Sequence, residues 1–275
     1  MDERKPIHIR AADPGFLETV SELFQTRELL WVLFVRQIKS RYAQTAFGAF
    51  WVLFQPVMAA ALYTLVFGVF VKVPTKGVPY VLFSYSAMVL WSVFAQGFDR
   101  AGMCLVQDER LITKTYFPRL HLPISAALST LPDLVISAAL LLPVAWIMGF
   151  PPRLQLLWAL PAIAAPLLLS MGAGAVIASL NVRWRDLRQM APFLVQIGVW
   201  ATPVAYPLEV APERWRSLLL LNPLTPPILL FRHAVLGSPF PPAWSLWTSV
   251  GSSFFLFFLG TWIFRRVEKT FADYI

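Results

Sequence analysis

The chain has little charge and almost no cysteine. Only 14% of its 275 residues are Asp, Glu, Lys or Arg, whereas a soluble domain carries about 25%. The single cysteine, Cys104, excludes an internal disulfide and a metal site built from several cysteines. The chain also lacks the G-x-x-x-x-G-K-[ST], H-E-x-x-H and G-x-S-x-G patterns. We therefore predict a protein that is not an enzyme, that hydrolyses no ATP itself and that holds no metal or cofactor of its own.

Long apolar runs take the place of the missing charge. Hydrophobic residues make up 57% of the chain, and its mean hydropathy is +0.62. The longest uncharged run, from Tyr42 to Val71, has 30 residues, and a helix needs only about 20 to cross a bilayer. We predict an all-α polytopic membrane protein whose transmembrane domain covers residues 42–275. Its six transmembrane helices are expected at about 44–71, 78–98, 122–148, 155–180, 189–208 and 243–264.

The charges that are present are mostly positive, with a net charge of +8. Such a balance in a soluble protein suggests nucleic acid as a partner, but in a membrane protein Lys and Arg mark the loops that stay in the cytoplasm. Of the 23 Lys and Arg residues, 17 lie in the two tails and in the loops that follow the second and fourth spans. We therefore expect both termini in the cytoplasm and no nucleic-acid partner.

Residues 1–41 are predicted to form a cytoplasmic tail that contains an amphipathic helix. Charged residues interrupt the stretch from Phe16 to Tyr42, so this stretch cannot cross the membrane. Leu23, Leu30, Phe34 and Ile38 recur at helical spacing, which is typical of a helix lying along the membrane interface. Such a helix either anchors the first span or surrounds the point where a substrate enters.

A second apolar segment, from Ser217 to Leu236, is too rich in proline to be a regular span. Asn222, Pro223 and the Pro226–Pro227 pair break it into two short pieces. Irregular backbone is tolerated at membrane depth only where protein or a water-filled cavity satisfies its polar groups. We predict a re-entrant helical hairpin on the external side, before the sixth span, with an ordinary packed external loop as the alternative.

The predicted spans contain one prominent ionisable residue, Asp133, which follows Pro132. Ionisable residues inside a membrane usually serve a function because they are costly there. Asp133 could therefore carry protons in an ion-coupled transporter. The favoured interpretation is that it caps a break in the third helix or pairs with a neighbouring arginine. The spans then contain little chemistry for ion coupling, and the energy source lies outside this chain.

Five separated blocks of sequence resemble the ABC-2 type permeases that export polysaccharides. They occur in the order expected for that family and are spread over most of the chain, from Arg36 to Ile275. The blocks are RQIKSRYAQTAFGAFWVLFQP from Arg36, ERLITKTYFPRLHLP from Glu109, LNVRWRDL from Leu180, TPVAYPLEVAPERWRSLLLLNPLTPPILLFRHAVLG from Thr202 and FRRVEKTFADYI from Phe264.

The resemblance implies an exporter in the inner membrane of a bacterium. The permease would form a homodimer that works with two copies of a separate P-loop ATPase, which binds the ATP and Mg²⁺. The substrate implied is a polysaccharide linked to undecaprenyl diphosphate, foremost an O-antigen, or else a teichoic acid or a capsular chain. The alternatives are an ABC-2 permease for another lipid or a drug, and an ion-coupled transporter that uses Asp133.

The resemblance also assigns the loop after the second span to a coupling helix that docks in a cleft of the ATPase. Apolar side chains would fill the cleft and charged ones would fix the register, unless the loop is only a cytoplasmic segment with its share of positive charge. The matching positions are Asp108, Glu109, Arg110, Leu111, Ile112, Lys114, Tyr116, Phe117, Pro118 and Arg119. Arg183, Arg185 and Asp186 in the second cytoplasmic loop would support this docking surface, or would only help to orient the chain.

The substrate has a diphosphate and a long sugar chain, and each has candidate partners. Arg36, Lys39 and Arg41 lie at about head-group depth, where they could receive the diphosphate or could bind anionic membrane lipids. Aromatic rings could let sugars slide through a channel, although aromatics also form belts at membrane interfaces. The candidate channel aromatics are Trp51, Phe54, Tyr63, Tyr85, Trp91, Trp200 and Tyr206.

Overall fold

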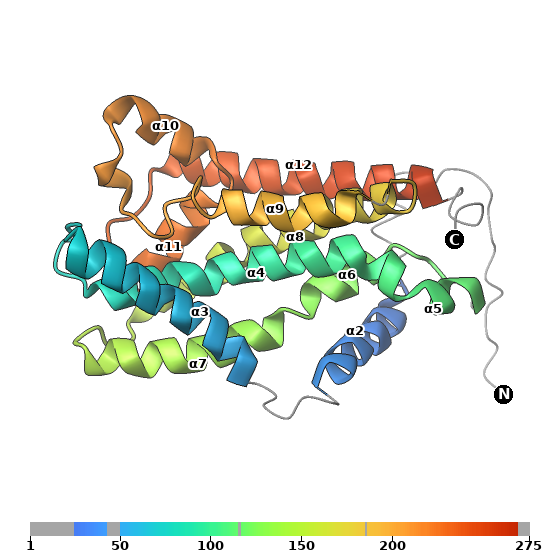
Figure 1. Cartoon of the computed structure of the whole chain (residues 1–275), viewed down its shortest axis with the longest axis horizontal. Helices are drawn as coiled ribbons and strands as arrows, with labels where there is room; N and C mark the ends of the chain where they lie inside the picture. Colours follow the sequence, from blue (N-terminus) through green and yellow to red (C-terminus); the bar gives the residue numbers. More distant parts are fainter. Residues whose placement is uncertain (1–24, 43–49, 115–116, 185, 269–275) are drawn as a thin grey trace.

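A computed structural model describes residues 25–42, 50–114, 117–184 and 186–268 of the chain, and every regular element in these ranges is a helix. Most helices run along the long axis of a bundle (Figure 1). The α-helices are α2 (Arg27–Tyr42), α3 (Phe50–Tyr63), α4 (Tyr80–Gln107), α5 (Glu109–Lys114), α6 (His121–Leu128), α7 (Leu131–Ile147), α8 (Ala159–Asn181), α9 (Leu187–Gly198), α10 (Glu213–Leu221), α11 (Thr225–Leu236) and α12 (Ala243–Glu268). A π-helix, η1 (Thr64–Phe70), and two 3₁₀-helices, η2 (Leu154–Trp158) and η3 (Leu208–Val210), complete the set.

Within the described residues, five helical segments are long and apolar enough to cross a membrane, and a bent pair of helices brings the possible number to six. The five segments are Phe50–Phe70, Tyr80–Gln107, His121–Ile147, Leu154–Asn181 and Ala243–Glu268. Their lengths, from 21 to 28 residues, match the hydrocarbon thickness of a bilayer. The chain is therefore a multi-pass membrane protein, as its composition predicted.

The structure differs from the prediction at the fifth span. The helix α9 has 12 residues, which is about 18 Å of length, too short for a hydrocarbon core of about 30 Å. Turns follow it instead of further helix. Pro203 has no N–H to continue the helical ladder, and the Asn222 side chain donates hydrogen bonds to Ala201 O and Thr202 Oγ1. Side-chain contacts from another part of the chain thus hold this segment in a non-helical form.

The proline-rich segment forms two helices, α10 and α11, at an angle of 93° to each other. Asn222 is extended at the bend, and its Oδ1 accepts a hydrogen bond from the N–H of Leu224. Pro226 and Pro227 stand in the first turn of α11, where a helix tolerates proline. The predicted break is therefore present, and this geometry fits both a broken span and a re-entrant hairpin.

The helices α4 and α8 form the centre of the bundle. In their most apolar stretches, 67% and 56% of the residues are buried, compared with 11% for the segment Phe50–Phe70. Small residues let α8 approach both of its main neighbours, because Gly174 faces Ala101 of α4 and Gly172 lies against the backbone of α12. Close packing through small residues is the usual way in which helices associate in a membrane.

Candidate functional site

A short helix, α5, forms at the position predicted for the coupling helix, and it lies at the same end of the bundle as α2 (Figure 1). The long helix α4 ends at Asp108, whose carbonyl oxygen then accepts hydrogen bonds from the N–H groups of Leu111 and Ile112. Glu109 and Arg110 are exposed, but Ile112 is buried in the core of this chain. Ile112 was predicted to fill a cleft of the ATPase, and the structure places it inward instead.

The residues after α5 are held by other parts of the chain. Phe117 is half-buried. The carbonyl oxygen of Pro118 lies 2.9 Å from Nδ1 of His121. Arg119 donates two hydrogen bonds to Glu268 at the end of α12, one from its N–H to Oε1 and one from its guanidinium to the carbonyl oxygen. Tyr116 lies outside the described residues.

Asp108 connects the start of α5 to α2. Its carboxylate is buried and accepts hydrogen bonds from Arg36 at 2.5 Å and from the Gln37 side chain at 3.0 Å. Asp108 was assigned to the coupling helix and Arg36 to diphosphate reception, so the structure joins two groups that the sequence had kept apart. Contacts with α2 therefore hold the residue that directly precedes α5.

A second charged cluster lies where the third span is interrupted between α6 and α7. Asp133 stands in the first turn of α7 and is 4% exposed. Its Oδ2 accepts hydrogen bonds from Arg41 of α2 at 2.5 Å and from Arg100 of α4 at 2.7 Å. Both arginines also donate to the carbonyl oxygen of Ser129. Of the two roles predicted for Asp133, a cap at a helix break or a pair with a neighbouring arginine, the arginine pair is confirmed.

Of the three residues predicted to receive a diphosphate, two are engaged in these ion pairs. Arg36 binds Asp108 and Arg41 binds Asp133, whereas Lys39 is exposed. Lys39 and Arg36 lie at the edge of an open groove on α2 whose other lining is mostly apolar. The groove is lined by Trp31, Val32, Val35, Arg36, Lys39 and Ser40.

The second predicted cytoplasmic loop joins α8 to α9 at the same end of the bundle as α5 (Figure 1). The Arg183 guanidinium lies 5.2 Å from the ring centroid of Trp184, and Asp186 directly precedes α9. Arg185 lies outside the described residues.

The predicted channel aromatics fall into three groups, one buried, one clustered around Trp200 and one exposed on α3. Tyr85 and Trp91 belong to the buried core of this chain, where neither faces an open surface. Tyr63 and Trp200 instead form a cluster in which their ring centroids are 5.9 Å apart. The hydroxyl of Tyr206 donates to the carbonyl oxygen of Trp200. Trp51 and Phe54 are exposed and stack edge-on at 5.3 Å.

Arg232 of α11 was not among the predicted site residues, yet it is only 1% exposed. Its guanidinium donates hydrogen bonds to the carbonyl oxygens of Phe83, Pro203 and Val204 and lies 3.5 Å from the centroid of the Phe83 ring. Arg232 had been counted with the external loops. Its position inside an apolar, proline-flanked helix is the one sequence signal that distinguished it from an ordinary loop cation.

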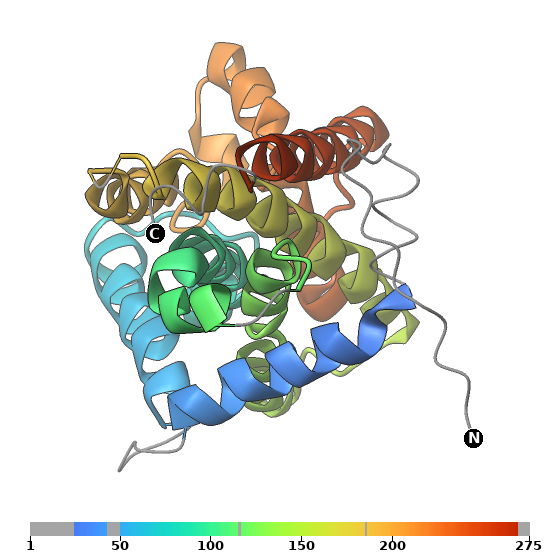
Figure 2. The same cartoon turned by 90° about the vertical axis from the view of Figure 1, so that its right-hand side faces the viewer.

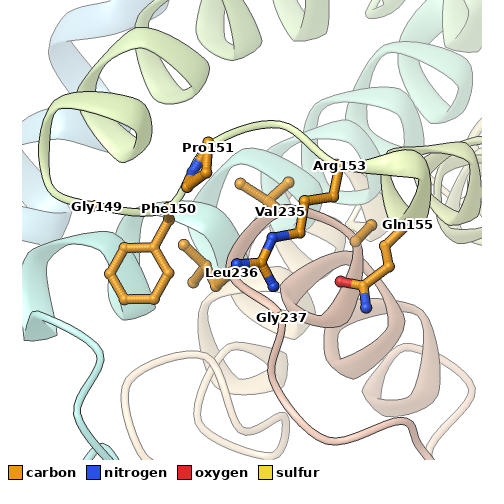
Figure 3. Close-up of a pocket in the computed structure, with 9 residues that line it drawn as sticks. Gly149, Phe150, Pro151, Arg153, Gln155, Val235, Leu236 and Gly237 are labelled. Carbon is orange, nitrogen blue, oxygen red and sulfur yellow. The ribbon is translucent and has the colours of Figure 1, made fainter.

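A small cavity of about 170 Å³ lies where the loop after α7 meets the end of α11 (Figure 3). The Arg153 side chain extends across it toward Gly237, which ends α11 in the left-handed conformation. A cation at this place complements the negative end of the α11 dipole. The position of Arg153 in this cavity is therefore explained by its charge at the end of α11.

Comparison with known proteins agrees with these features. The O-antigen export system permease protein RfbA of Myxococcus xanthus is 28% identical over 94% of this chain and 100% of the relative. The protein of the same name from Klebsiella pneumoniae is 25% identical over 90% of this chain and 94% of the relative. The polysialic acid transport protein KpsM of Escherichia coli is 22% identical over 86% of this chain and 92% of the relative.

The model of the ABC-2 type transporter family matches residues 28–236, which include α2 and every helix up to α11. This match covers well over half of the chain, and the relatives extend it over nearly the whole length. The chain belongs to the ABC-2 type transporter family, and the resemblance to its polysaccharide-exporting members is confirmed.

Proposed function

We propose that the chain is the permease subunit of an ATP-driven exporter that moves a polysaccharide linked to undecaprenyl diphosphate, foremost an O-antigen, across a bacterial inner membrane. The observation that carries the proposal is a multi-pass membrane chain without a phosphate-binding loop that bears a short helix, α5, at the end of its bundle. A pump of this kind needs a surface where a separate ATPase can attach. The RfbA relatives, which are named for O-antigen export, support the choice of substrate.

The charge distribution supports placing α2 and α5 on the cytoplasmic side. The tails and loops at this end hold 17 of the 23 Lys and Arg residues, as the positive-inside rule requires of cytoplasmic segments. The ATPase subunits, which bind ATP and Mg²⁺, then dock on α5 with Glu109 and Arg110 at the contact. In this orientation α10 and α11 form the external re-entrant hairpin.

In our proposal two copies of the chain enclose the pathway, and an aromatic cluster from the end of α3, η1 and the turns after α9 lines it. Tyr63, Phe67 and Trp200 lie with ring centroids 5.9 to 6.5 Å apart. Such rings offer flat surfaces on which the apolar faces of sugars can slide. A homodimer with one pathway on its two-fold axis is the commonest closed assembly.

For the lipid head group, we propose that Lys39 receives the diphosphate at the edge of the α2 groove, with Trp31 and Val35 beside the lipid chain. The proton-relay alternative has weaker support, because Asp133 is engaged by two arginines.

The test is ATP hydrolysis by the permease purified together with the P-loop ATPase encoded beside it. In lipid nanodiscs, the undecaprenyl-diphosphate-linked polysaccharide should raise hydrolysis severalfold, because the substrate shifts the complex toward its working state. The same polysaccharide released from its lipid is the matched control and should have little effect. Stimulation by an unrelated lipid or drug, but not by the lipid-linked polysaccharide, would contradict the substrate assignment.

A further inference from the structure

The helix α2 carries two arginines that reach different parts of the bundle. Arg36 pairs with Asp108 at the start of α5, and Arg41 pairs with Asp133 at the break in the third span. The two arginines are five positions apart in the sequence, which is about 7.5 Å along a helix axis. Figure 2 shows α2 lying across the end of the bundle, where one rigid helix can contact both places.

Apolar packing joins the same three elements. Leu33 of α2 is 4% exposed and belongs to a buried cluster that includes Ile112 of α5 and Leu122 of α6. The helices α2 and α6 also pack directly against each other. Leu33 and Ile112 belong to the same closely packed cluster, so a shift of α5 disturbs the packing of this cluster around α2.

The receiving site at the third span is a place where the helix can bend. Pro132 supplies no N–H, and α6 ends at Leu128 before α7 begins at Leu131. Both Arg41 and Arg100 donate to the Ser129 carbonyl oxygen as well as to Asp133. The break is thus held from α2 on one side and from α4 on the other.

We propose that α2 is a lever that transmits movement of the docking helix α5 to the break in the third span. This inference rests on the proposed function, because an ATPase must move α5. The Asp108–Arg36 pair passes the movement to α2, and the Arg41–Asp133 pair changes the angle between α6 and α7. Arg36, Arg41 and Asp133 act as positioning residues, while Arg100 fixes the break to α4.

Both ion pairs suit this role because one partner in each is buried. The side chains of Asp108 and Asp133 are 7% and 6% exposed, so salt screens these pairs less than surface pairs. A buried carboxylate that loses its arginine becomes costly. Asp108 therefore follows Arg36 when α2 moves, whereas Asp133 is held by Arg41 and Arg100 together, so that a movement of Arg41 acts against the fixed position of Arg100.

The experiment is a double-mutant cycle in the permease–ATPase complex, with polysaccharide exported per ATP hydrolysed as the readout. Asp108→Asn and Asp133→Asn each break one pair while keeping the shape of the side chain. Each is expected to lower the ratio about tenfold, within the range typical of coupling between sites. Because the two pairs act in series, the double variant should export as much polysaccharide per ATP hydrolysed as the single variant with the lower ratio.

Purely structural contacts give a different result. Independent sites contribute additively to stability, so two unrelated contacts would give the double variant the product of the two losses. That product, or an unchanged ratio in either single variant, would overturn the lever. The exchange of charges in Arg36→Asp with Asp108→Arg should restore most of the ratio, and failure to restore any of it would also overturn the lever.

The matched control is Arg27→Gln, which removes an exposed arginine from the first turn of the same helix and should leave the ratio unchanged. All variants are compared as folded complexes isolated by gel filtration, so that lower yield is not mistaken for lower coupling. Failure of the unmodified permease to bind the ATPase would overturn the proposed function itself. This outcome is distinct from an additive double variant, which overturns the lever alone.

Discussion

Replacing Gly260 with alanine is expected to force α12 away from α8 and to destabilise the permease strongly. A Cβ at Gly260 would lie 2.7 Å from the carbonyl carbon of Gly172, and one at Gly172 would lie 2.5 Å from Cα of Phe257. These neighbours are backbone atoms of helices and cannot move aside alone. Overpacking usually costs about 1–3 kcal/mol, and we expect about 3 kcal/mol or more here.

The measurement is the midpoint of thermal unfolding of the purified permease in detergent, followed by tryptophan fluorescence. We expect Gly260→Ala to lower it by roughly 10 °C. Gly251 lies in the same helix with no atom within 4 Å of its would-be Cβ. Gly251→Ala should therefore raise stability by up to about 1 kcal/mol, the usual gain from glycine to alanine in a helix. Equal midpoints for the two variants would show that α8 and α12 do not touch at Gly260.

The second large effect is expected from Arg232→Met. Methionine keeps the apolar stem but removes the guanidinium, which leaves the carbonyl oxygens of Phe83, Pro203 and Val204 without this donor. Each lost hydrogen bond to a charged group costs about 1.5–3 kcal/mol, so we expect a total loss of about 3–5 kcal/mol. The turns after α9 should then lose their attachment to α11.

Limited proteolysis of the loops around α10, together with the thermal midpoint, measures this effect. Cleavage between α9 and α10 should become faster in Arg232→Met, because Arg232 binds the backbone at Pro203 and Val204. The matched control is Arg214→Met in the same proline-rich segment, where the exposed guanidinium lies over the Trp215 ring. An Arg232 variant as stable as the Arg214 variant would contradict the role of Arg232 as a structural clamp.

Much of the fold followed from the sequence because a membrane limits the possible structures. Apolar runs of sufficient length predicted the helices that are long and apolar enough to cross a membrane. The prolines near Asn222 predicted the bend between α10 and α11. The pairing of Asp133 was also foreseeable, because a carboxylate cannot lie buried in apolar surroundings without a partner. Each of these features depends only on the type of residue and on the apolar membrane around it.

Other features depend on contacts between distant parts of the chain, which residue patterns do not reveal. The predicted fifth span ends early because Asn222 binds the backbone at Ala201. The sequence does not distinguish the aromatic residues Tyr85 and Trp91 from Trp200. Tyr85 and Trp91 are buried because α4 lies at the centre of the bundle, whereas Trp200 is exposed. Arg36 and Arg41 resemble loop cations in the sequence. Only the position of α2 across the end of the bundle brings them to Asp108 and Asp133 (Figure 2).

In our proposal, ATP hydrolysis by a bound partner drives a lipid-linked polysaccharide through this permease. Inverted membrane vesicles that contain the permease and its ATPase, loaded with labelled undecaprenyl-diphosphate-linked polysaccharide on their outer face, test it most directly. We predict that ATP moves the polysaccharide to the interior, where a polysaccharide hydrolase added outside cannot reach it, and that a proton gradient without ATP does not. Movement driven by the gradient alone, and abolished by Asp133→Asn, would contradict the account.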